Sequence, residues 1–225
     1  MPKESGKKVT VVREHPMHVP VSKKNPSGVT MRDRHLRRLK GTYLDETEIE
    51  AVFKNYDRNG LIYPTTNKLS KYKNADKYDE VIAVWTDYFN KKFKAKPPLD
   101  PDVVKALIAS ESGFRADPSE NKTAIGITQI TKDTLKIMQD PNGETKDFIF
   151  RDIRQKDLKN SNIAIPMGVR WLFRKRETAM NQLKRSPDHE ELILEYKGLL
   201  KSKTKQKDKA LKNFRENYAD LKKKF

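Results

Sequence analysis

The sequence predicts a mainly α-helical protein with an irregular, basic N-terminal extension. Apolar residues recur at helical spacing in several separate segments that begin near residue 45. Capping residues precede these segments, and Gly or Pro follows several of them. The first 40 residues are instead rich in Pro, Lys and Arg, and residues 25–28 (NPSG) form a turn signal. We therefore expect a basic extension over residues 1–75 and a helical domain over residues 76–225.

The first two expected helices cover residues 45–56 and 76–94. The first begins with acidic residues, which favour a helix N-terminus, and its apolar residues Ile49, Val52 and Phe53 share one face. Gly60 and Pro64 come after its end. The second carries apolar and aromatic residues at helical spacing, and a Lys-Pro-Pro sequence ends it. A basic stretch at residues 32–40 is a further place where a helix could begin.

The next helix, over residues 100–112, has the clearest boundaries. Asp100 is an N-cap, Pro101 fits the first turn, and Gly113 is a typical C-terminal stop. Leu107 and Ile108 lie on its apolar face. After a loop over residues 115–131, four more helices are expected over residues 131–138, 162–184, 187–200 and 205–224. Thr131 caps the first of these, Ser-Pro starts the third, and the last is lysine-rich.

Composition limits the chemistry that the chain can perform. Of its 225 residues 35% are hydrophobic and 35% are charged, and the formal net charge is +17, so the chain should be attracted to nucleic acid, anionic membranes or anionic cell-wall polymers. With no cysteine, disulfides, thiolate metal sites and cysteine nucleophiles are excluded. The four histidines lack ligand spacing, so we expect no metal and no cofactor. We also expect no transmembrane segment and no secretory signal peptide, because no long apolar run is present.

Glu111 is the first candidate for a chemical role. It follows Leu107 by four residues and therefore lies on the apolar face of the expected helix 100–112. Its place in the last turn and its apolar neighbours both disfavour the carboxylate anion. A carboxyl group that stays protonated near neutral pH is what glycosidic cleavage requires. The plain alternative is a surface glutamate paired with a lysine at the helix end.

Three ordered motifs surround this position: residues 109–114 (ASESGF), 124–130 (AIGITQI) and 194–198 (LEYKG). They resemble the lytic transglycosylase family of the soluble-murein-transglycosylase and goose-type-lysozyme kind. Its pattern is Glu-Ser-x-Phe, Gly-Leu-Met-Gln-Ile and Ala-Tyr-Asn-x-Gly. Residues 162–172 also look like the family's Asn-Ile helix, and the likeness runs from about residue 76 to at least 198. It implies a lysozyme-like α-helical domain that acts on peptidoglycan glycan strands.

The resemblance also implies site residues. Glu111 would protonate the oxygen between N-acetylmuramic acid and N-acetylglucosamine and then act as the base. Tyr196 would hydrogen-bond Glu111, although a core tyrosine is its plain interpretation. Ser112 would orient the acid or the sugar, or simply cap the helix. The substrate-binding residues it implies are Ser112, Gly126, Thr128, Gln129 and Tyr196. Phe114 would pack beneath the site or stack on sugar.

The chain departs from the family pattern at two positions. Thr128 stands where Met is usual, and Lys197 stands where Asn is usual. A lysine beside Glu111 would favour the carboxylate anion and so oppose the acid role, unless Lys197 points to solvent.

The outcome of the reaction stays open between lyase and hydrolase. Most glycosidases use two carboxylates, and Asp117, Glu120 and Asp133 are the available partners. A lytic transglycosylase needs one, since the muramyl C6 hydroxyl attacks and gives a 1,6-anhydro product. Because no second catalyst stands out, we expect the lyase, with a hydrolytic muramidase as the alternative.

A non-catalytic wall- or nucleic-acid-binding protein is the rival from another class, favoured by the lysine-rich C-terminus. We expect no nucleic-acid partner, because the aromatic residues are not spaced as stacking platforms along the basic segments. Since peptidoglycan lies outside the cytoplasm, we expect action in the periplasm or cell wall after non-classical delivery. A phage or a secretion machine would deliver the chain as an antibacterial effector, and an immunity protein would then block it.

Overall fold

The chain divides into two compact units, Met1–Thr42 and Tyr43–Phe225. The structure is a computed structural model, and it describes residues 9–12, 15–32, 35–38, 42–116 and 123–223.

The N-terminal unit contains paired β-strands. Strand β1 (Val9–Val12) pairs antiparallel with β4 (His35–Arg38), and β2 (His15–His18) pairs antiparallel with β3 (Val29–Arg32). The turn predicted at residues 25–28 is present, with the Gly28 N–H donating to the Asn25 carbonyl. These strands give the expected basic arm an extended form, and β4 replaces the helix considered within residues 32–40. Pairing across the turn depends on backbone hydrogen bonds, which composition does not reveal.

The helical unit begins earlier than the predicted domain, at residue 43 rather than 76. Helix α1 (Glu46–Lys54) follows a capping box in which Asp45 and Glu48 bond each other's backbone N–H. Leu44, Ile49 and Leu69 are buried in the same core as the later helices. Residues 43–75 therefore pack as part of this unit.

The predicted helices are confirmed with small shifts at their ends. A 3₁₀ turn, η1 (Ala75–Tyr78), precedes the second predicted helix, and a second 3₁₀ turn, η2 (Gln155–Lys159), precedes the fifth. In the described part of the chain, the helices after α1 are α2 (Asp79–Lys92), α3 (Pro101–Ser112), α4 (Lys132–Gln139), α5 (Ser161–Leu183), α6 (His189–Tyr196) and α7 (Thr204–Lys222). No helix in the described residues is both long and apolar enough to span a membrane.

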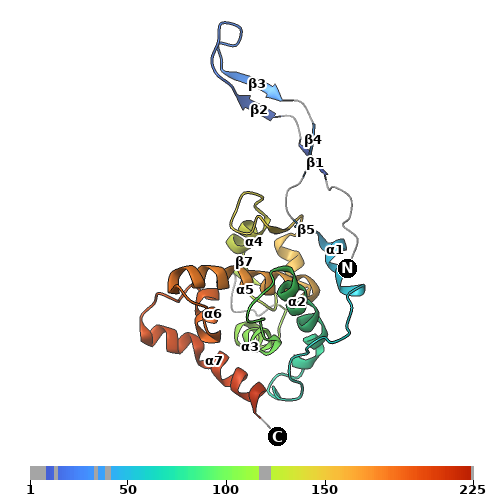
Figure 1. Cartoon of the computed structure of the whole chain (residues 1–225), viewed down its shortest axis with the longest axis vertical. Helices are drawn as coiled ribbons and strands as arrows, with labels where there is room; N and C mark the ends of the chain where they lie inside the picture. The colour runs from blue at the N-terminus through green and yellow to red at the C-terminus, as the bar shows by residue number, and fades with distance from the viewer. Residues whose placement is uncertain (1–8, 13–14, 33–34, 39–41, 117–122, 224–225) are drawn as a thin grey trace. The chain divides into compact units, whose positions relative to one another are not determined.

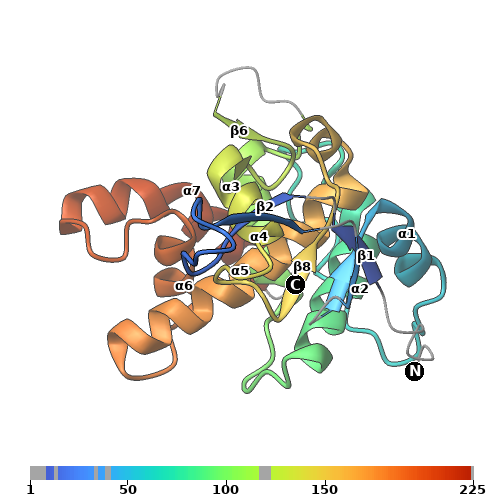
Figure 2. The ribbon, with the colours of Figure 1, turned by 90° about the horizontal axis from the view of Figure 1, so that it is seen from above.

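Helix α5 runs through the middle of the helical unit and organises its core. It packs against α2 on one side and α6 on another, while α3 packs against α7 (Figures 1 and 2). The apolar faces predicted for α2 and α3 are buried, with Trp85, Phe89, Leu107 and Ile108 fully covered. Burial of these stripes stabilises the helices more than their intrinsic propensity does.

Short strands fill the spaces between the helices. Strand β5 (Thr42–Leu44) pairs with β8 (Phe148–Phe150), and β6 (Ala124–Ile125) forms an antiparallel hairpin with β7 (Ile130–Thr131). The β6–β7 hairpin includes the apolar strip that was expected to be a loop. It connects directly to α4 through the Thr131 cap.

A fully buried lysine anchors α3 to the rest of the unit. Lys105 has no exposed surface, and its ammonium lies 2.5 Å from a carboxylate oxygen of Asp76 and 2.7 Å from one of Asp79. It also donates to the Thr65 carbonyl at 2.9 Å. Burial raises the pKa of Asp79 to about 6, against the opposing influence of Lys105. The cluster holds the segment before α2 against α3, the helix that carries Glu111.

Candidate active site

Glu111 lies in the last turn of α3, and its side chain is 15% exposed. The helix ends at once, because Gly113 takes a left-handed conformation with φ 59° and closes the turn onto Ala109. Leu107 and Ile108 are fully buried one turn earlier, as the helical spacing predicted. The carboxylate is therefore at the edge of the core, largely buried but still in contact with solvent.

Lys197 points to Glu111 and not to solvent. Its ammonium forms an ion pair with Glu111 Oε1, and its side chain is 17% exposed. Lys197 is the C-cap of α6, and its backbone N–H donates to Ile193 and Glu195 carbonyls. The two charges come from helices far apart in sequence, α3 and α6. The departure from the family pattern at residue 197 thus places a cation on the candidate acid.

Tyr196 makes a different hydrogen bond from the one expected. Its hydroxyl donates to the Thr128 backbone carbonyl at 2.7 Å and so ties α6 to the loop after β6. Burial raises the pKa of the Tyr196 phenol well above its usual value, and the nearby Glu111 carboxylate raises it further. The phenol therefore stays protonated and is a fixed donor close to Glu111.

Gly126 is required by the fold itself. Its φ is +78°, and a Cβ atom at this position would lie 2.1 Å from the Leu158 carbonyl oxygen. The family resemblance implied that Gly126 is a substrate-binding residue. The structure shows that a backbone carbonyl occupies that space, so the glycine sets the path of the loop.

The two side chains that follow in this motif face different ways. Thr128 is 1% exposed, and its hydroxyl donates to the Ala164 carbonyl of α5 at 2.9 Å. It packs so closely that a Cβ on Gly168 would lie 2.6 Å from its methyl group. Gln129 is half-buried, and its amide donates to the Gly126 carbonyl at 2.8 Å. Of the two, only Gln129 retains a partly exposed side chain for a substrate.

Ser112 and Phe114 support the site from beneath. The Ser112 hydroxyl is buried and lies 2.7 Å from the Ile127 carbonyl, with the Ile108 carbonyl at 3.2 Å. It therefore joins the end of α3 to the loop that contains Gln129. Phe114 is 5% exposed and packs against the rings of Tyr72 and Tyr78, which places it in the core.

The structure gives no support for a second catalytic carboxylate among the described residues. Asp133 is 87% exposed in the first turn of α4 and pairs with Lys136 at 3.5 Å. Asp117 and Glu120 lie outside the described residues. Within the residues that the structure describes, no group of three or more His, Cys, Asp or Glu side chains is arranged to hold a metal.

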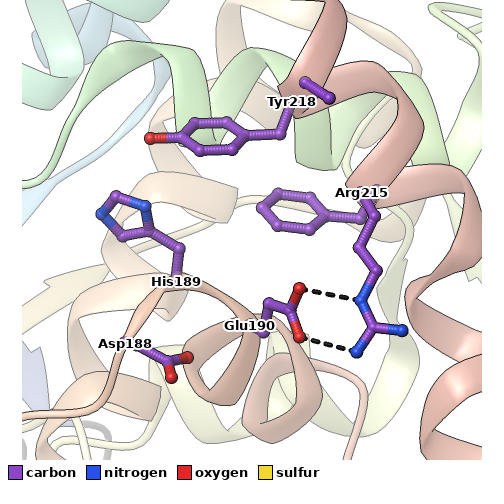
Figure 3. Close-up of a pocket in the computed structure, with 7 residues that line it drawn as sticks. Asp188, His189, Glu190, Arg215 and Tyr218 are labelled. Carbon is purple, nitrogen blue, oxygen red and sulfur yellow. Dashed lines mark hydrogen bonds and ion pairs between the residues drawn. The ribbon is translucent and has the colours of Figure 1, made fainter. Parts of the chain in front are cut away.

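A separate hollow of about 410 Å³ lies between the N-terminus of α6 and helix α7 (Figure 3). Glu190 accepts two hydrogen bonds of 2.7 Å from Arg215, which hold the pKa of Glu190 below its usual range. Tyr218 packs against both His189 and Phe214. The lining includes none of the predicted site residues, so this hollow is distinct from the surroundings of Glu111.

The sequence interpretation missed how its motifs are joined. Tyr196 and Ser112 each bond a backbone carbonyl of the 126–130 loop, at Thr128 and Ile127. The structure thus brings Glu111, Ser112, Gln129 and Tyr196 around one loop, while Thr128 and Gly126 serve its packing. Backbone carbonyls carry no sequence signal, so only the motif order indicated that these segments meet.

The model of the Transglycosylase SLT domain matches residues 87–217, which is more than half of the chain. The match includes all three motifs and the helices from α3 to α6. No curated protein and no solved structure matches the chain.

Proposed function

Since the chain belongs to the Transglycosylase SLT domain family, and is thereby a lytic transglycosylase that acts on peptidoglycan, we propose that Glu111 is its catalytic acid and base. The bond cleaved is the β-1,4 linkage between N-acetylmuramic acid and N-acetylglucosamine. The observation that carries the proposal is the position of Glu111, a partly buried carboxylate at the end of α3 beside Tyr196 and the 126–130 loop.

The proposed reaction uses one carboxyl group twice. Protonated Glu111 gives its proton to the glycosidic oxygen as the bond to the muramyl anomeric carbon breaks. The resulting carboxylate takes the proton of the muramyl C6 hydroxyl, whose oxygen forms the new bond to the anomeric carbon. The product is a 1,6-anhydro sugar, and Glu111 returns to its protonated form. No water enters the products.

A Glu111→Gln variant tests the assignment. The amide keeps the shape of the side chain but cannot donate the proton, so we expect release of soluble fragments from purified sacculi to fall about 10²- to 10⁴-fold. Asp133→Asn is the matched control, because this exposed carboxylate has no part in a one-carboxylate mechanism and its variant should match the parent. Equal activity of Glu111→Gln and the parent would disprove the role of Glu111.

Mass spectrometry of the digested glycan tests the chemistry. We expect muropeptides that end in 1,6-anhydromuramic acid, whose mass is lower by one water than that of a reducing-end product. Reducing ends alone would establish the hydrolytic alternative, and Asp117→Asn and Glu120→Gln variants would then identify the second carboxylate.

The proposed site of action is the periplasm or cell wall, where the substrate lies, after delivery by a phage or a secretion machine. Expression in a bacterial host with an added export leader should lyse the cells, while the same chain kept in the cytoplasm should not. If a co-expressed protein from a neighbouring gene suppresses this lysis, the result would support the effector role and identify that protein as the immunity protein. If no protein from a neighbouring gene suppresses lysis, the result would oppose the effector role.

A further inference from the structure

We infer that Lys197 is a specificity-determining residue that binds a carboxylate of the muramyl unit in the substrate. The inference rests on the proposed role of Glu111. In the structure the Lys197 ammonium pairs with Glu111 Oε1. When a glycan with a carboxylate on its muramyl residue enters, the ammonium transfers from Glu111 to that carboxylate.

The ion pair between Lys197 and Glu111 conflicts with the proposed reaction. To protonate the leaving oxygen, Glu111 must itself carry a proton. An ammonium in contact with a carboxylate stabilises the anion, and both side chains are more than four-fifths buried, where such a pair is little screened. The contact must therefore open before the proton is transferred.

The side chain of Lys197 can move while its backbone stays in place. The backbone at Lys197 is held at the end of α6, because the N–H groups of Gly198 and Leu199 donate to the Glu195 and Leu194 carbonyls. The lysine side chain, by contrast, is a flexible four-carbon stem with a point charge at its tip. The ammonium can thus leave Glu111 by rotation of its own side chain, with α6 and the Tyr196 hydrogen bond unchanged.

Once it has left Glu111, the Lys197 ammonium needs another anion. The carboxylates of α6 already have other cations: Glu190 pairs with Arg215, Glu191 with Arg185, and Glu195 with Lys175. A largely buried ammonium that loses its partner without gaining another is unfavourable. The muramyl residue next to the scissile bond supplies a carboxylate, as the lactyl group of peptide-free strands or as part of an attached stem peptide.

The test compares matched substrates that differ only in this charge. Peptide-free glycan strands are used as they are, or after carbodiimide coupling of their lactyl carboxylates to ammonia, which gives neutral amides. We expect the parent to cleave the carboxylate strands with kcat/KM about tenfold higher or more, the factor typical of one charge-assisted hydrogen bond. In Lys197→Met this ratio should fall to about one, and Lys197→Arg should keep most of it.

Lys201→Met is the control, since this exposed lysine lies just beyond α6 and its loss should leave the ratio unchanged. The parent could cleave free and amidated strands with equal kcat/KM and yet prefer strands that carry stem peptides. If that preference depends on Lys197, the carboxylate that Lys197 binds lies on the peptide. A ratio near one in both comparisons, or a preference that survives in Lys197→Met, would overturn the inference.

These outcomes are separate from failure of the proposed function. If Glu111→Gln abolishes cleavage of every strand but the ratio does not depend on Lys197, the role of Glu111 stands and only the inference fails. If Glu111→Gln cleaves as well as the parent, both fail. Because each ratio is taken within one protein preparation, partial unfolding of a variant does not alter it.

Discussion

Helix α3 carries two lysine–carboxylate pairs that differ in burial and in the number of contacts. Near its middle, Lys105 is fully buried and contacts Asp76, Asp79 and the Thr65 carbonyl. At its end, Glu111 contacts Lys197 while both side chains keep some exposure. The first pair holds the chain together and cannot open without exposing buried charge. The second lies at the edge of the core, where the lysine can exchange Glu111 for another anion, and this exchange is what a reacting carboxyl group needs.

The largest expected effect is on the buried pair. Lys105→Met should lower the free energy of unfolding by about 3–5 kcal/mol at pH 7, because the Asp79 charge loses its partner in the core. Urea denaturation measures the change, and a loss below about 1 kcal/mol would show that the pair is not structural.

The pH dependence of the same variant gives an independent check. The folded-state pKa of Asp79, about 6 with Lys105 present, lies above the usual value near 4 and should rise further without it. Folded Lys105→Met therefore binds this proton more tightly than the unfolded chain does. Its stability should be greatest below about pH 4 and should fall as pH rises through 6. A deficit relative to the parent that is the same at pH 4.5 and pH 7 would contradict this.

Gly126→Ala should have the next largest effect, because it disturbs the framework around the second pair. We expect a loss of about 3 kcal/mol in unfolding free energy, from a Cβ placed 2.1 Å from the Leu158 carbonyl oxygen together with the cost of positive φ. Gly60→Ala is the control for φ alone, since its φ is +69° with nothing within 4 Å of the added Cβ. Equal losses in the two variants would exclude the clash.

Ser112→Ala should have an intermediate effect of about 1–2 kcal/mol. It removes the hydrogen bond to the Ile127 carbonyl and leaves a buried acceptor without its partner. Ser110→Ala is the comparison, because the Ser110 hydroxyl donates to Leu107 within its own helix. Thermal unfolding measures both, and a larger loss for Ser110→Ala would contradict the importance of the link between α3 and the loop.

The smallest expected effect on stability is that of Lys197→Met, at about 1 kcal/mol or less. The substitution leaves no unpaired ammonium behind, and Glu111 keeps 15% of its side chain exposed, so water can hydrate its carboxylate. Denaturation under the conditions used for Lys105→Met gives a direct comparison. A loss as large as that of Lys105→Met would mean that both pairs are structural and that the second does not open readily.

Much of the helical unit follows from local sequence. Asp100 and Thr131 cap helices as predicted, and Gly113 ends α3 in a left-handed conformation. These signals act over a few residues, so a single segment contains them. The boundary of the extension was less predictable: whether residues 43–75 join the core depends on Leu44, Ile49 and Leu69 meeting helices that come later in the chain.

The sequence by itself determined the order of the helices, the place of Glu111 on an apolar face, and the three motifs that indicate the family. Tertiary structure decided which neighbour reaches that carboxylate. Tyr196 and Lys197 are adjacent at the end of α6, yet the tyrosine bonds the Thr128 carbonyl and the lysine pairs with Glu111. Consecutive residues on a helix point about 100° apart, so the choice depends on how α6 docks against α3 and the loop. That docking brings together residues far apart in the chain, since 68 positions separate Thr128 from Tyr196 and 86 separate Glu111 from Lys197.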